Sequence, residues 1–116
     1  MELGTKRIYD APARADGMRI LVDRLWPRGV RKETANVDIW AKDLAPSGTL
    51  RSWFHEDPEK RYEAFTEKYR RELKEKKSVA RELLRGKKRA TLITAARDIE
   101  RSHVPVLASF LKRLAR

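Results

Sequence analysis

Hydrophobic residues gather in three short runs, and each run predicts a β-strand. The strongest run covers 18–25, and its centre at 20–22 is apolar at consecutive positions, as expected of a strand covered on both faces. Weaker candidates cover 6–10 and 89–96. Pro27 follows the strongest run, and because proline cannot donate a ladder hydrogen bond, we expect the strand to end before it.

Elsewhere apolar residues recur every three or four positions, which is the spacing of an amphipathic helix. The longest such stretch begins at Asp57, an N-cap residue, with Pro58 at the first helical position. Its apolar stripe consists of Tyr62, Phe65, Tyr69 and Leu73. A second helix ends before Gly86, and Ser102 begins the last helix.

The predicted order is strand, strand, irregular segment, two helices, strand and helix. The irregular segment covers 30–56, with short helical pieces near 38–42 and 49–54, and Ser47 is the N-cap candidate of the second piece. Strands separated by helical crossovers pair in parallel. We therefore predict one α/β domain over residues 1–116, a small three-layer fold in which a short, mostly parallel sheet is flanked by helices. The strand order stays open.

The strongest strand delivers charged side chains into the loop that follows it. Asp23, Arg24 and Arg28 come directly after its apolar centre, and Arg97 with Asp98 follow the third strand. In open α/β sheets, ligands bind outside the carboxyl ends of the strands. If the two strands are parallel neighbours, these five residues meet in one cleft. Arginines favour phosphate or carboxylate, since a guanidinium binds two oxygens at once.

Trp26 and His103 are two further candidate site residues. Trp26 would stack a base or shield the cleft from water. His103 stands at the start of the last helix, where the dipole disfavours its charged form, and is an acid or base candidate together with Asp23 and Asp98. Structural alternatives stay open: ion-pair struts for the charged pairs, core packing for Trp26 and a helix-start position for His103. The role of His55 also stays open.

Composition removes several classes of chemistry. The chain has no cysteine, which excludes a thiol nucleophile, a disulfide framework and Cys-ligated zinc or iron–sulfur centres. With two histidines, a His-rich metal site is excluded as well, and we expect no metal and no cofactor. The nucleotide-binding and hydrolase motifs G-x-x-x-x-G-K-[ST], G-x-G-x-x-G, H-E-x-x-H and G-x-S-x-G are absent.

The chain is strongly basic, with 28 lysines and arginines, 17 acidic residues and a net charge of +11. Such a charge attracts polyanions, although no nucleic-acid-binding motif is present. Charged residues interleaved on helix faces also describe an ordinary surface, including a heat-adapted one. No apolar run approaches the ~20 residues needed to span a bilayer, and the N-terminus has no apolar signal core. We expect a cytoplasmic protein with no membrane partner.

Several stretches together resemble the YeaO-like family, a family of domains of unknown function. The most specific is V-D-R-L-W-P-R-G at 22–29. Weaker stretches follow in the family's order and extend the resemblance over nearly the whole chain: 40–47, 50–54, 57–58, 69–73 and 91–98. The resemblance implies a small cytoplasmic α/β protein and adds Lys42 and Asp43 to the ligand-binding candidates. The chain departs from the family at Ser102, where an asparagine usually precedes the histidine.

The sequence thus predicts an anion-accepting cleft at the strand ends, with a phosphate-bearing small molecule, such as a nucleotide, as its ligand. Arg24, Arg28 and Arg97 would hold the anion, while Asp23 and Asp98 would orient the guanidinium groups or act as a base. Whether a substrate is turned over stays open, as does the oligomeric state. Two alternatives remain: a nucleic-acid-associated module that binds non-specifically through its basic surface, and a structural or interaction protein with no ligand.

Overall fold

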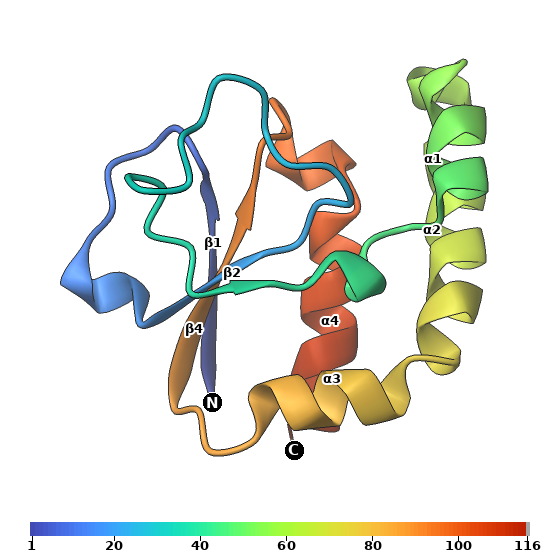
Figure 1. Cartoon of the computed structure of the whole chain (residues 1–116). Helices are drawn as coiled ribbons and strands as arrows, with labels where there is room; N and C mark the ends of the chain where they lie inside the picture. The colour runs from blue at the N-terminus through green and yellow to red at the C-terminus, as the bar shows by residue number, and fades with distance from the viewer. Residues whose placement is uncertain (116) are drawn as a thin grey trace.

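A four-stranded, all-parallel sheet forms the centre of the protein (Figure 1). The computed structural model describes residues 1–115. The strands are β1 (Glu2–Arg7), β2 (Met18–Leu21), β3 (Ile39–Trp40) and β4 (Arg89–Thr94), in the spatial order β1-β4-β2-β3. The α/β class and the parallel pairing of the two main strands are therefore confirmed. The last strand in the sequence, β4, is central and lies between β1 and β2.

Two of the α-helices begin at the caps that the sequence predicts, whereas the last begins at Val104, with His103 rather than Ser102 at its N-cap. The four α-helices are α1 (Gly48–His55), α2 (Pro58–Lys74), α3 (Lys77–Leu84) and α4 (Val104–Leu114). Ser47 Oγ accepts the Leu50 N–H at 3.2 Å ahead of α1, and Asp57 Oδ1 accepts the Lys60 N–H at 3.5 Å ahead of α2. These bonds occupy donors that a helix N-terminus otherwise leaves without a partner. Three 3-10 turns complete the structure: η1 (Arg14–Asp16), η2 (Lys42–Leu44) and η3 (Ile99–Arg101).

The two faces of the sheet are covered by different kinds of chain (Figure 1). On one face, Ile20 and Leu92 pack in the main core with side chains from all four α-helices. On the other face, Leu21 and Ile93 belong to a smaller cluster that irregular chain covers. That cluster contains Ile8 and Ala35, with Trp26, Val30, Val37, Trp40 and Ala95 packed against it. The third layer of the fold is therefore loop rather than helix.

Strand boundaries differ from the prediction at the two edges of the sheet. β1 covers Glu2–Arg7 instead of 6–10, because an edge strand is half exposed and needs no apolar run. β3 occupies Ile39–Trp40, where a helical piece was expected, and pairs with only two residues of β2. Two residues are too few for an alternating pattern to appear in the sequence.

A buried ion cluster ties the start of β2 to the neighbouring chain. Asp16, only 5% exposed, accepts bonds from Lys6 Nζ at 2.8 Å, Arg19 Nη1 at 2.6 Å and the Ala13 N–H at 3.0 Å. The Lys6 hydrogen bond and the Ala13 amide outweigh burial and, with Arg19, lower the pKa of Asp16 from 3.8 to about 2. Arg19 also donates to the Asn36 carbonyl at 2.8 Å, which fixes the covering loop.

We predict that Asp16→Asn lowers the free energy of unfolding by about 3 kcal/mol at pH 7, since it leaves a buried arginine without its charge partner. A carboxyl with a lowered pKa stabilises the fold above its unfolded pKa, and that stabilisation disappears as the pH falls toward 2. Urea unfolding at several pH values should therefore show the difference from wild type shrinking between pH 4 and pH 2. Glu33→Gln, in an exposed pair with Arg31, is the control and should change little. An equal difference at all pH values would contradict the assignment.

Candidate functional site

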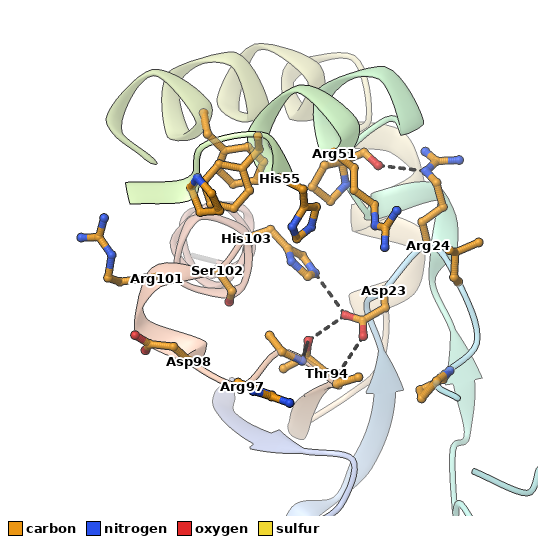
Figure 2. A pocket seen from close by; sticks show the side chains of 18 of the residues that line it. Asp23, Arg24, Arg51, His55, Thr94, Arg97, Asp98, Arg101, Ser102 and His103 are labelled. Atoms are coloured by element: carbon orange, nitrogen blue, oxygen red, sulfur yellow. Dashed lines mark hydrogen bonds and ion pairs between the residues drawn. The ribbon is translucent and has the colours of Figure 1, made fainter. Parts of the chain in front are cut away.

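A cavity of about 770 Å³ lies at the carboxyl ends of β2 and β4 (Figure 2). Its walls come from the loop after β2, the segment after β4, the start of α4 and the α1–α2 region. Leu21 is the register partner of Ile93, so the two strands end side by side. This pairing brings Arg24 and Arg97, from distant parts of the sequence, to the lining of one cavity.

Asp23 binds the two strand ends to each other. Its Oδ1 accepts the Thr94 hydroxyl at 2.7 Å, and its Oδ2 accepts the Ala95 N–H at 2.8 Å. The Asp23 side chain is 16% exposed and contacts His103 rather than an arginine. The expectation that Asp23 orients a guanidinium group is therefore not met, because its oxygens serve the β4 terminus and His103.

Several interactions set the charge of Asp23. Burial alone would raise its pKa, but hydrogen bonds from His103, the Ala95 amide and the Thr94 hydroxyl outweigh burial, and the net result is a pKa below the usual value. The carboxylate is therefore ionised at neutral pH. It places a fixed negative charge between the two strand ends.

His103 is held in a defined orientation at the same place. Its Nε2 lies 2.9 Å from the Val22 carbonyl oxygen and 3.4 Å from Asp23 Oδ1. Both partners accept hydrogen bonds, so Nε2 carries the hydrogen. Tyr69 packs edge-on against the imidazole, with ring centroids 6.1 Å apart, and donates its own hydroxyl to the Leu44 carbonyl at 2.5 Å.

His55 enters the cavity from the end of α1 (Figure 2). Burial, followed by the positive charge of Arg51 and the neighbouring His103, lowers the pKa of His55 below its ordinary value. Its ring centroid lies 5.5 Å from that of Phe54. At neutral pH His55 therefore adds a mostly uncharged imidazole to this wall.

Arginines dominate the charge of the cavity. Five of them line it: Arg24, Arg28, Arg51, Arg97 and Arg101. Among residues 1–115, none of these five forms an ion pair with a carboxylate. Arg24 Nε donates to the Pro46 carbonyl at 2.9 Å, and Arg101 Nη2 to the Glu59 carbonyl at 3.4 Å. Their remaining N–H groups can bind an anion.

Asp98 lies on the same wall as Arg97 and is exposed (Figure 2). In the described part of the chain its carboxylate forms neither an ion pair nor a side-chain hydrogen bond. Asp23, Glu59 and Asp98 are the three carboxylates of the lining. Five arginines therefore face three carboxylates, of which one is already used within the protein.

Part of the cavity wall is apolar. Leu25 is 60% exposed, which is unusual for a large aliphatic side chain, and it lines the cavity together with the prolines at 27, 46 and 58. Phe54 and Phe65 stack with their ring centroids 4.3 Å apart and contribute to the same lining. The cavity thus offers contacts for an uncharged part of a ligand as well as for an anion.

Three sequence candidates have contacts elsewhere. Lys42 and Asp43 lie in η2 outside the cavity lining, and Lys42 Nζ lies 4.7 Å from the centre of the Trp40 ring. Trp26 lines the cavity, but its indole N–H donates to the Val30 carbonyl at 2.7 Å and its ring packs edge-on against Trp40. Trp26 therefore shapes the loop after β2, and its polar edge is already used.

Arg51, Arg101 and Thr94 also belong to this site, although no sequence pattern singles them out. Arg51 follows the Ser47 cap by four residues, so the cap prediction could have placed it near the loop after β2. Thr94 is the last residue of β4, and its β-branched side chain gave no sign of a polar role. Arg101 lies in the 3-10 turn η3, which has no signal in the sequence.

Neither a metal centre nor a membrane segment is found in the described residues. No cluster of three or more histidine, aspartate or glutamate side chains within 1–115 could hold a metal ion. None of the helices in that range has the length and hydrophobicity required to cross a bilayer.

Fold and cavity together define a small α/β protein with an arginine-lined hollow at the ends of its parallel strands. The chain belongs to the YeaO-like family, since residues 2–116 match the family described as the inactive DUF488-N3 subclade. It is 44% identical over 106 residues to the uncharacterised protein Rv3073c of Mycobacterium tuberculosis, which covers 90% of this chain and 89% of that protein. The uncharacterised protein YeaO of Escherichia coli is 39% identical over 116 residues, with 98% and 100% covered. No solved structure matches the chain.

We predict that Asp23→Ala destabilises the fold by about 3 kcal/mol, because the buried Thr94 hydroxyl and the Ala95 N–H lose their acceptor. Asp98→Ala is the matched control, since the same substitution in the same cavity removes no such bond and should cost under about 0.5 kcal/mol. Chemical denaturation at pH 7 measures both. Equal stability of the two variants would show that Asp23 has no structural role.

Proposed function

We propose that the protein binds a phosphate-bearing small molecule, such as a nucleotide, in the cavity at the ends of β2 and β4. One observation carries the proposal: the arginines around the cavity have no carboxylate partners in residues 1–115. Arg24, Arg28 and Arg97 are the main anion contacts. Arg24 and Arg101 bond to backbone carbonyls, whereas the side chains of Arg28, Arg51 and Arg97 make no hydrogen bond within residues 1–115, which favours a ligand contact over a strut role for these three.

Binding without turnover fits the site better than catalysis. Asp23 is already bound to Thr94, Ala95 and His103, so it is poorly placed to remove a proton from a ligand. His103 uses Nε2 for the Val22 carbonyl. The family description includes the word inactive, which agrees with a site that retains a ligand but does not transform it.

A polyanion is the competing ligand, because the net charge of +11 attracts nucleic acid of any sequence. The two proposals differ in their dependence on salt. An anion bound by a few arginines in a cavity releases few counterions. A nucleic acid that contacts many surface lysines loses about 10³–10⁵ in affinity between 50 and 200 mM salt.

We predict that AMP binds saturably to the wild-type protein in isothermal titration calorimetry at 150 mM salt. Arg97→Gln should weaken AMP binding about tenfold, because a charge-assisted hydrogen bond contributes ~1.5–3 kcal/mol. Arg113→Gln, on the exposed side of α4, removes the same charge outside the cavity and should leave the affinity unchanged. Equal losses in both variants would point to non-specific attraction and would contradict the proposal.

A further inference from the structure

We propose that the cavity is built for a ligand with two separate anionic groups joined by an uncharged part, as in a nucleoside bisphosphate with its phosphates on different sugar positions. This inference rests on the proposed function and narrows its ligand class. It follows from the positions of the arginines, the charge between them and the apolar lining.

The free arginines lie in two groups on opposite sides of the cavity (Figure 2). Arg24, from the loop after β2, and Arg51, from α1, lie on one side. Arg97, from the segment that joins β4 to α4, lies on the other side, whereas Arg101 of the same segment points away from Asp23, with its guanidinium carbon 4.9 Å from the centre of the Tyr62 ring. Each group is anchored to a different part of the fold.

A negative charge separates the two groups. Asp23 lies between them at the junction of the strands, and its carboxylate is ionised and accepts bonds only from within the protein. A phosphate placed against this carboxylate would be repelled. Anionic groups are therefore favoured at the two ends of the cavity, near the arginines, and disfavoured at its middle.

Two histidines and two further carboxylates also line the cavity. His103 has its Nε2 directed at the Val22 carbonyl and Asp23, and His55 has a lowered pKa and is mostly uncharged at neutral pH. Glu59 and Asp98 add negative charge at the rim. Both carboxylates would oppose a single highly charged cluster of phosphates.

The space between the ends suits an uncharged group. The cavity volume of about 770 Å³ falls within the ~300–1,000 Å³ of small-molecule sites and far exceeds one phosphate. Leu25 and Phe54 line it and supply apolar surface. A sugar and base would fill this space, with one phosphate held at each end.

Three nucleotides test the inference on the same base. Calorimetry at 150 mM salt would compare AMP, ADP and adenosine 3′,5′-bisphosphate with the wild-type protein. ADP is the control, since it also has two phosphates but carries them next to each other. We expect the 3′,5′-bisphosphate to bind at least about tenfold more tightly than either AMP or ADP, because only it can reach both arginine groups.

Two single-residue variants test whether the arginines on each side of the cavity contribute independently to binding. Arg51→Gln and Arg97→Gln should each reduce the affinity for the bisphosphate about tenfold, and the double variant should lose both contributions. Arg113→Gln again controls for net charge. Both cavity arginines are exposed, so the variants should fold, which circular dichroism would verify.

Each result has a definite meaning. ADP binding as tightly as the bisphosphate would overturn the two-ended site, because total charge would then explain the affinity. AMP binding with no gain from the second phosphate would also overturn it, while the proposed function would stand. Absence of binding by all three nucleotides would overturn both proposals.

Discussion

The candidate site depends on the parallel pairing of β2 with β4, which the Asp23 carboxylate completes beyond the last residues of the two strands. Asp23 and Thr94 are 71 positions apart in the sequence, yet their side chains form a hydrogen bond of 2.7 Å. Backbone pairing ends at the Val22 N–H, which donates to the Ile93 carbonyl at 3.0 Å. Beyond this bond, the Asp23 carboxylate joins the two segments by accepting hydrogen bonds from Thr94 and Ala95. The two segments then diverge around the carboxylate and form the cavity.

The use of Asp23 inside the protein has a consequence for the arginines. Had Asp23 formed an ion pair with Arg24 or Arg97, that guanidinium group would be occupied within the protein and less available to an anion. Because it binds Thr94, Ala95 and His103 instead, Arg24 and Arg97 line the cavity without a carboxylate partner among residues 1–115. The hydrogen-bond partners of Asp23 therefore leave these two arginines available for the anion contact that we propose.

Sequence patterns predicted the parts of the fold that have strong local signals. The caps at Ser47 and Asp57 and the apolar run in β2 identified α1, α2 and the central sheet. β1 was misplaced and β3 was missed, because edge strands are short or half exposed. Because parallel strands end at the same edge of a sheet, the sequence predicted that Arg24 and Arg97 would line one cavity. It did not predict the hydrogen-bond partners of Asp23, because these depend on side-chain geometry that the hydrophobic pattern does not encode.

The net charge of the protein and the charged groups that line the cavity attract an anion over different distances. The charge of +11 attracts any polyanion, but salt screens it beyond ~8 Å at physiological ionic strength. Inside the cavity, the free guanidinium groups and the Asp23 carboxylate lie within one small space, so screening between them is weak. The surface charge can therefore raise the local concentration of anions without selecting among them. In the proposed site, selection comes from arginines on two sides of the Asp23 carboxylate, an arrangement that a uniformly basic surface does not provide.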